Sequence, residues 1–298
     1  MKPLTWAAVI ATFLLMAIGN VVSATGSGLA CPDWPLCHGR LIPPLQADVL
    51  IEYSHRLTAA VASILLIATI IATIRSRSPR PVRRIAVGLL VLLGLQIALG
   101  GITVLLRLPH LISTAHLVNA LLILGGLLLL ASRLGASPAT APLPKTARLA
   151  RVGLIVLLVQ LALGGYVRHA GAGLACPDFP LCSGDAFPTH WLGVVHWVHR
   201  WLGVALIGLF VHLAIASRRT PVATAATITA LLALLQVTLG IVTVLSQLSP
   251  PVRALHAAIG YALWGSLVWT SARAGCWRAT LTEPIVRRRG TVEVARAS

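Results

Sequence analysis

Eight long apolar runs dominate the sequence, and each is close to the length that crosses a lipid bilayer. A spanning helix needs about 20 predominantly apolar residues. The runs cover roughly 5–24, 50–74, 85–106, 111–132, 150–169, 191–216, 222–245 and 252–273. Only 10% of the residues are charged, against about 25% in an average soluble domain. The sequence therefore predicts an all-α membrane protein with eight transmembrane helices.

The basic residues lie mostly on one side of these predicted helices. Of the 24 Lys and Arg residues, 18 fall near the N-terminus, in the connections that follow the second, fourth and sixth helices, or in the C-terminal tail. By the positive-inside rule, both termini are expected in the cytoplasm of a multi-pass protein of the cell membrane. The same rule accounts for the net charge of +17 without a nucleic-acid partner. We interpret residues 4–24 as a first spanning helix and not as a signal peptide, because the segment has a counterpart later in the chain.

The second half of the chain repeats the first. Residues 25–37 and 170–182 are identical at ten of thirteen positions. Gln96 and Gly100 return as Gln236 and Gly240, at an offset of 140. The repeat predicts two pseudo-symmetric four-helix bundles in parallel orientation, over 1–135 and 150–273. A cytoplasmic linker over 136–149 joins them, and a basic cytoplasmic tail covers 274–298.

Four histidines occupy duplicated positions near the predicted outer ends of the helices. They are His55 with His116 in the first half and His199 with His256 in the second. Such side chains can face one another across a bundle, which is a standard way to hold a haem iron. The alternative is hydrogen-bonded packing between helices, but four histidines at a common depth favour haem ligation, and zinc would need further ligands. His196 lies one turn before His199 and is the other candidate; the match between His199-Arg200 and His55-Arg56 favours His199.

Glu52 marks the place where the repeat breaks, since His196 stands at the corresponding position. A carboxylate beside a ligand can move protons or stabilise developing positive charge. The alternative is a solvated residue at the start of a helix. Arg56 and Arg200 either pair with haem propionates or extend to the membrane surface. The asymmetry predicts a reacting N-terminal half and a C-terminal half with a permanent cofactor.

Two close cysteine pairs on the outer side indicate an oxidising compartment. They are Cys31 with Cys37 and Cys176 with Cys182, each in a Pro-rich turn. A disulfide that holds the loop over a pocket is the structural interpretation, and a redox-active pair is the functional one. The structural interpretation is favoured for Cys176 and Cys182, whereas both interpretations stay open for Cys31 and Cys37. Asp33 and Asp178 are expected to cap the turns.

Glu52-x-x-His55-Arg56, the outer Cys31 and Cys37, and the four duplicated histidines together resemble the haem A synthase family over nearly the whole chain. This resemblance implies eight helices in two pseudo-symmetric halves. It also implies oxidation of a ring methyl of haem O, through an alcohol, to the formyl group of haem A for cytochrome oxidase cofactor biosynthesis. Haem O synthase, the prenyltransferase that makes the substrate, and the cytochrome oxidase assembly machinery are then the expected partners.

The resemblance also implies a role for each matching residue. His55, His116 and Arg56 would bind the substrate haem, and His199, His256 and Arg200 would hold haem b. Glu52 would assist at the reacting centre, and the Cys31–Cys37 disulfide would touch the substrate during the cycle. Cys176 and Cys182 match a second disulfide that some members of the family have.

Two other functions fit the residues alone. A membrane cytochrome b that exchanges electrons with a quinone would use the same histidines for two permanent haems. A quinone-linked thiol–disulfide oxidoreductase would depend on the cysteine pairs and need no haem. Glu52 discriminates among these functions, because substrate chemistry uses a buried acid and electron shuttling does not obviously need one.

Overall fold

A computed structural model describes residues 1–76, 78–134 and 143–277, and its long elements there are all α-helices. They are α1 (Lys2–Ala24), α2 (Ala47–Arg75), α3 (Arg80–Leu105), α4 (His110–Leu134), α5 (Pro144–His169), α6 (Trp191–Ser217), α7 (Ala223–Leu245) and α8 (Pro250–Ala274). A short 3₁₀ turn, η1 (Ala172–Leu174), follows α5. The eight expected helices are confirmed, with most ends displaced by a few residues. The protein is an all-α, multi-pass membrane protein.

Prolines and a glycine define several of the helix ends. Proline stands in the first turn of α1, α3, α5 and α8, where its missing N–H costs no hydrogen bond. α8 ends at Gly275, whose φ of 87° is the left-handed conformation that glycine adopts without strain. α5 begins at Pro144, so residues 144–149 of the predicted linker are helical. Residues 136–142 of that linker and residues 278–298 of the predicted tail lie outside the described residues.

α8 differs from the other helices in its place within the bundle. Helices α1 to α7 are long and apolar enough to cross a membrane, whereas α8 is not among the spans that composition alone identifies. It carries Arg253 and His256, and it packs against α1, α4, α5 and α7. Polar residues of membrane proteins face the bundle interior. The lower hydropathy of α8 therefore reflects its central position.

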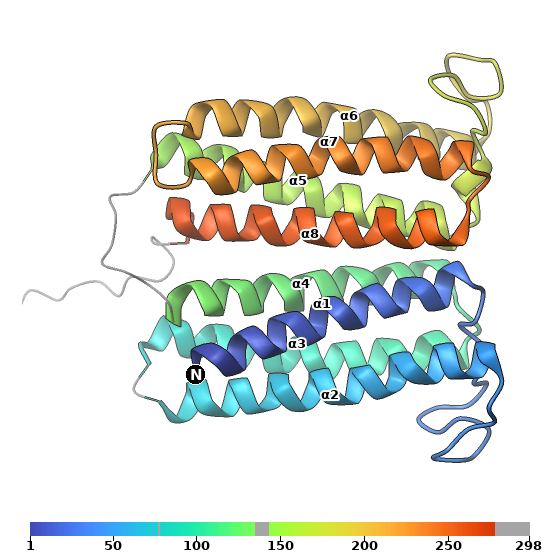
Figure 1. The fold of residues 1–298 in the computed structure, drawn as a ribbon, viewed down its shortest axis with the longest axis horizontal. Helices are drawn as coiled ribbons and strands as arrows, with labels where there is room; N and C mark the ends of the chain where they lie inside the picture. The colour runs from blue at the N-terminus through green and yellow to red at the C-terminus, as the bar shows by residue number, and fades with distance from the viewer. Residues whose placement is uncertain (77, 135–142, 278–298) are drawn as a thin grey trace, which may run out of the picture.

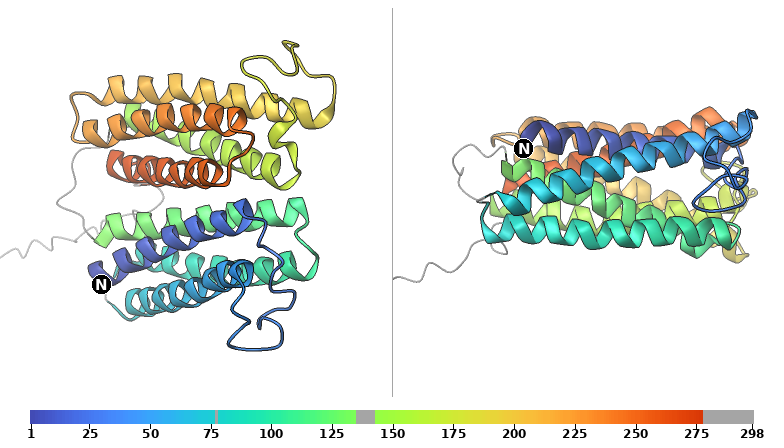
Figure 2. Two further views of the ribbon diagram at one scale, coloured as in Figure 1. Left: turned by 45° about the vertical axis from the view of Figure 1, so that its right-hand side comes forward. Right: turned by 90° about the horizontal axis from the view of Figure 1, so that it is seen from below.

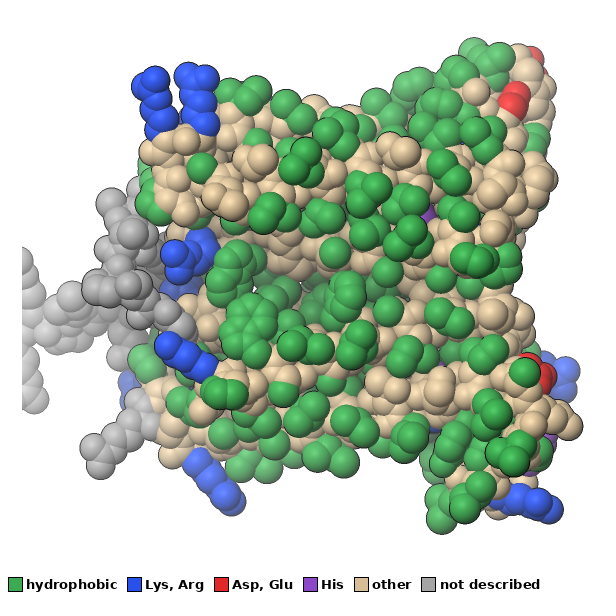
Figure 3. Space-filling view, in the orientation of Figure 1, with side chains coloured by type: hydrophobic (Ala, Val, Ile, Leu, Met, Phe, Trp, Pro, Cys, Tyr) green, Lys and Arg blue, Asp and Glu red, His purple; other side chains and the backbone are tan. Residues whose placement is uncertain are grey.

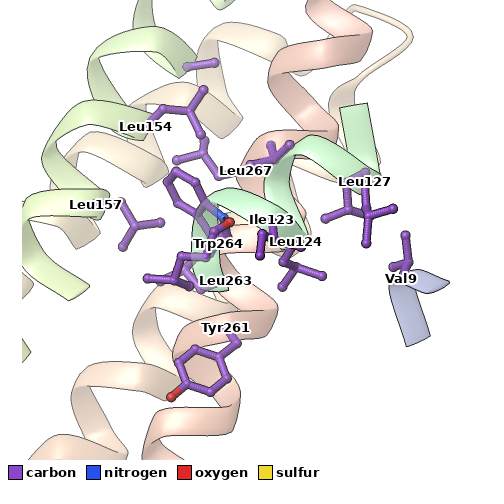
Figure 4. Close-up of a cluster of buried hydrophobic side chains, with 14 of the residues drawn as sticks. Val9, Ile123, Leu124, Leu127, Leu154, Leu157, Tyr261, Leu263, Trp264 and Leu267 are labelled. Atoms are coloured by element: carbon purple, nitrogen blue, oxygen red, sulfur yellow. Dashed lines mark hydrogen bonds between the residues drawn. The ribbon is translucent and has the colours of Figure 1, made fainter. Parts of the chain in front are cut away.

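The two predicted halves are visible as two groups of four helices. α1–α4 form one group and α5–α8 the other, side by side (Figure 1). The groups meet where α8 contacts α1 and α4, and where α4 contacts α5. At this interface Trp264 of α8 lies near Ile123 and Leu124 of α4 (Figure 4). It donates a hydrogen bond of 2.8 Å from Nε1 to the carbonyl oxygen of Leu121. One continuous apolar core thus joins the halves.

The molecule has two chemically different ends. Both cysteine loops lie at one end, and the N-terminus lies at the opposite end (Figures 1 and 2). Lys and Arg side chains gather at the end with the N-terminus, whereas apolar side chains cover the surface between the ends (Figure 3). An apolar girdle between polar ends is the surface expected of a protein in a bilayer. The predicted outer ends of the helices therefore share one end with the cysteine loops.

Candidate functional site

Each of the four duplicated histidines packs edge-on against a glycine of a neighbouring helix. A Cβ atom built on the glycine would lie 2.7 to 3.2 Å from the imidazole Cε1, closer than an ordinary contact of 3.4 Å or more. The pairs are His55 with Gly19 at 2.9 Å, His116 with Gly100 at 3.2 Å, His199 with Gly164 at 2.7 Å and His256 with Gly240 at 3.2 Å. Any other residue at these glycines would push the ring away. The four imidazoles thus occupy equivalent, shaped positions in the two halves.

Within each half the two imidazoles lie close together. His55 and His116 are near enough for their charges to interact, and so are His199 and His256. The Nδ1 atom of each ring is buried and lacks a hydrogen bond of regular geometry. Each ring nevertheless lies near a main-chain group of the residue four positions before its partner glycine. A buried polar atom without a partner costs about 1–3 kcal/mol. With Nδ1 beside the main chain, Nε2 of each ring is the nitrogen that fits a haem iron, and a haem iron takes one ligand on each face.

Gln96 and Gln236 contact the histidines and were not predicted as functional residues. The Gln96 side-chain nitrogen lies 3.1 Å from Nε2 of His116, and the Gln236 nitrogen lies 3.4 Å from Nε2 of His256. Asn119 holds the first amide in place by donating to Gln96 Oε1 at 2.6 Å. The sequence carried the signal, because these glutamines are duplicated polar residues in apolar spans. Without the structure, this duplication indicates only that the chain contains an internal repeat.

A cavity of about 270 Å³ lies in the C-terminal half. Its walls include His196, His199 and His256 together with residues of α5 to α8. Glycines of all four helices of this half, among them Gly164 and Gly240, line the cavity and present no side chain to it. Apolar walls with two adjacent imidazoles and nearby arginines suit a flat, apolar macrocycle that carries an iron and anionic groups. The residues of this half therefore fit a haem.

His196 and His199 both line this cavity but have different surroundings. His199 packs on Gly164 as His55 packs on Gly19. His196 is buried, with 4% of its surface exposed, and its Nε2 accepts a hydrogen bond of 3.3 Å from Nε of Arg200. His199 is thus the geometric counterpart of His55.

Glu52 is buried, with only 3% of its surface exposed. Its Oε2 accepts a hydrogen bond of 2.7 Å from the main-chain N–H of Cys31, and its Oε1 forms an ion pair of 2.6 Å with Nη2 of Arg56. The alternative of a solvated residue at a helix start is wrong, because the first loop folds back over the carboxylate. Glu52 thus connects the helix that carries His55 to the first cysteine.

Arg56 and Arg200 reach into the cysteine loops. Nη2 of Arg56 donates to the carbonyl of Cys31 at 2.9 Å, and its Nη1 donates to the carbonyls of Asp33, at 2.7 Å, and Leu36. Arg200 repeats this pattern with the carbonyls of Cys176, Asp178 and Leu181. Both Nη groups of each guanidinium are engaged. Each arginine therefore fixes its loop to the helix that carries the adjacent histidine.

Both cysteine pairs form disulfides, Cys31–Cys37 and Cys176–Cys182, with Cα–Cα distances of 4.7 and 4.4 Å. The turns within them are capped as expected. The carboxylate of Asp33 accepts hydrogen bonds from the N–H groups of His38 and Gly39 at 2.6 and 2.7 Å, and Asp178 does the same with Ser183 and Gly184. The N–H of Gly39 is the main cause that lowers the pKa of Asp33, and the N–H of Gly184 has this effect on the pKa of Asp178.

Fold and site together define a class: a duplicated helical membrane protein with two half-buried histidines in each half, each packed on a glycine of a neighbouring helix. The chain belongs to the COX15-CtaA family, described as cytochrome oxidase assembly protein, whose model matches residues 2–268. This match confirms the resemblance to the haem A synthase family.

Curated relatives match along most of this chain. A protein of Bacillus pumilus named heme A synthase is 32% identical over 278 residues, which are 86% of this chain and 87% of the relative. A heme A synthase of Bacillus licheniformis is 30% identical, over 87% of this chain and 91% of its own length. A heme A synthase of Staphylococcus saprophyticus is 27% identical, over 90% of this chain and 94% of its own length. The likeness therefore covers both halves of the molecule.

Proposed function

We propose that this protein is a haem A synthase that oxidises a ring methyl of haem O to the formyl group of haem A, for cytochrome oxidase. Membership of the family and the names of the relatives support this function over a quinone-linked cytochrome b or a thiol–disulfide oxidoreductase. The protein is then an oxidoreductase whose substrate and product are both haems.

The observation that carries the assignment of the sites is the pair of facing histidines in each half. His55 and His116 hold the substrate haem O, and His199 and His256 hold haem b. When bound, haem b supplies one-electron redox chemistry. The glycines Gly164 and Gly240 let both imidazoles of the C-terminal half approach the cavity from opposite helices. His199 is favoured over His196, because His196 is hydrogen-bonded to Arg200.

The reacting half is the N-terminal one, because a buried carboxylate, Glu52, stands one helical turn before His55, whereas His196 stands at the equivalent position before His199. Oxidation of a methyl group releases protons, and Glu52 is placed to hold one or pass it on. Its carboxylate touches the Cys31 main chain, so the Cys31–Cys37 loop closes the substrate site above His55. Arg56 pairs with the carboxylate and holds the loop in place.

The direction in the membrane follows from the charges. The end with the basic residues faces the cytoplasm, so both termini are inside and the disulfide loops lie on the outer face of the cell membrane. Haem O is apolar because of its long alkyl chain, so delivery by haem O synthase through the bilayer or by direct contact fits the apolar surface of this protein.

The test is to identify the haems bound to purified protein from cells that also make haem O. Wild type is expected to contain haem b together with haem O or haem A. His199→Ala and His256→Ala should lose haem b. His55→Ala and Glu52→Gln should retain haem b and form no haem A.

His212→Ala is the matched control, since His212 is exposed on the same helix as His199. It should match wild type in both haems. Haem b alone, with haem O available, would favour the electron-shuttling cytochrome. If the purified protein contained no haem, the thiol–disulfide oxidoreductase would be the favoured function.

A further inference from the structure

We propose that Arg168 and Arg253 bind the two porphyrin carboxylates of the haem in the C-terminal half. The N-terminal half lacks this pair, which leaves its haem free to exchange. The inference rests on the proposed function, because it takes the C-terminal haem as resident and the N-terminal haem as substrate.

Both arginines lie at the cavity that His199 and His256 share. Arg168 comes from the end of α5 and Arg253 from the start of α8, and both line the cavity. Arg168 is near enough to His256 and to Arg253 for their charges to interact. Two guanidinium groups therefore lie together at the end of the cavity next to the cysteine loops.

These two cations have no anionic partner among the described residues, 1–76, 78–134 and 143–277. Among the residues that the structure describes, the one ion pair joins Arg56 to Glu52. Arg168 donates to the side-chain oxygen of Asn20 and, at 2.9 Å, to the Asn20 carbonyl, and Arg253 donates to the carbonyl of Ala24. A charge inside a membrane protein is costly unless it is paired. A ligand with two carboxylates would provide the missing charge.

Donor groups remain available for such a ligand. A guanidinium has five N–H groups in a fork that matches a carboxylate. The contacts with Asn20 and Ala24 use only some of them, and Nε of Arg253 is buried without a hydrogen-bond partner. Arg200 also lines the cavity, but both of its Nη groups are bound to loop carbonyls. Arg168 and Arg253 are therefore better placed to bind carboxylates than Arg200.

The N-terminal half has neutral residues at the equivalent positions. The offset of 145 that aligns Gly164 with Gly19 aligns Arg168 with Ser23. The offset of 140 that aligns His256 with His116 aligns Arg253 with Ser113, whose buried Oγ has no hydrogen-bond partner. The first half can thus hold a haem by its histidines without two buried charge pairs. A substrate that must enter and leave needs this weaker hold.

The first experiment measures how fast purified holoprotein loses haem b to apomyoglobin. Arg168→Gln and Arg253→Gln should each lose haem b about tenfold faster than wild type, the effect expected when one charge-assisted hydrogen bond is removed. The midpoint potential of haem b should fall in both variants, because a nearby positive charge favours the reduced iron. Arg168→Lys and Arg253→Lys should restore most of the potential.

Two controls separate carboxylate binding from a structural role. Asn20→Ala removes the contact of Arg168 with the Asn20 side chain, but it keeps the contact with the Asn20 carbonyl and the charge of Arg168, so it should leave the potential of haem b unchanged. Arg107→Gln removes an exposed arginine at the same end of the molecule and should change neither quantity. A fall in potential with Asn20→Ala equal to that with Arg168→Gln would overturn the assignment of Arg168.

A measurement on the wild-type sites covers the case in which the Gln variants do not fold. Iron protoporphyrin IX and its dimethyl ester are added to wild-type protein produced without haem, and their affinities for the C-terminal half are compared. The ester should bind at least tenfold more weakly. Equal affinities, or equal rates of haem b loss in wild type and the Gln variants, would overturn the inference. Wild type that contains no haem b would instead overturn the proposed function.

Discussion

Replacement of Gly164 by Ala tests whether the glycines position the histidines that we propose bind haem. A Cβ at position 164 would lie 2.7 Å from Cε1 of His199, whereas ordinary contacts begin at 3.4 Å. Because Cε1 is at the tip of a ring that can turn, we expect the imidazole to move away from the cavity. Crowding of a packed site costs about 1–3 kcal/mol. Removal of glycine from a helix interior returns about 0.5–1 kcal/mol.

The net change in the free energy of unfolding is therefore a loss of about 0–2.5 kcal/mol. The larger effect falls on the ligand, so haem b content should drop sharply. Gly208→Ala is the matched control in the same half, since nothing lies within 4 Å of a Cβ at that position. It should be as stable as wild type or slightly more stable, with normal haem b.

The assay is thermal unfolding in detergent together with the ratio of haem b to protein. The contact distances also predict an order: Gly164→Ala should disturb its histidine more than Gly240→Ala, at 2.7 against 3.2 Å. In the first half, Gly19→Ala should spare haem b and reduce haem A. The reasoning is refuted if Gly164→Ala retains haem b fully and gains stability as Gly208→Ala does.

Three further predictions concern the loops and the buried thiol. Arg56→Gln should accelerate hydrogen exchange of the Cys31–Cys37 loop, because the loop loses its contacts with the Arg56 side chain of α2. The variant should form no haem A but retain haem b. Exchange of the loop at the wild-type rate would contradict this prediction. The pKa of Asp178 is lowered from 3.8 mainly by the Gly184 N–H, so the turn is stabilised above pH 3.8 and loosens as the pH falls through the lowered pKa. Asp178→Asn should loosen this turn at every pH, and hydrogen exchange corrected for intrinsic rates would measure this. If the variant still loosened as the pH falls, Asp178 would be excluded as the titrating group. Burial raises the pKa of Cys276, whose Sγ donates to the Ala147 carbonyl at 3.0 Å, so a maleimide should label it slowly in folded protein and rapidly in denaturant; rapid labelling of folded protein would show that the site is open.

The helices and their repeat could be predicted because both depend on local sequence. Hydropathy over about 20 residues identifies a spanning helix whatever its neighbours are. The duplication is visible as identical residues at a constant offset, so the equivalence of His55 and His199 follows from the sequence. The turn caps Asp33 and Asp178 could also be predicted, since their partners lie only five and six residues away.

The roles of the arginines could not be predicted in this way. Arg56 and Arg200 contact loops 19 to 25 residues away in the chain, and only the folded loop brings those carbonyls to the guanidinium. Arg168 is 148 residues from Asn20, and this contact exists because α5 lies near α1. Hydropathy carries no information about which helix neighbours which. Local sequence therefore cannot place Arg168 and Arg253 above Arg56 and Arg200 as carboxylate ligands.

The sequence by itself determined the helical membrane fold, the two halves and the histidines, because these features are set by local composition and by the repeat. Only the tertiary structure decided which side chains meet. It placed each imidazole on a glycine of another helix and enclosed Glu52 beneath the first disulfide loop. It also left Arg168 and Arg253 at the cavity without an anion from the part of the chain that the structure describes. The physical reason is that hydrogen bonds and close contacts act over a few ångströms in space, between residues that the chain separates widely.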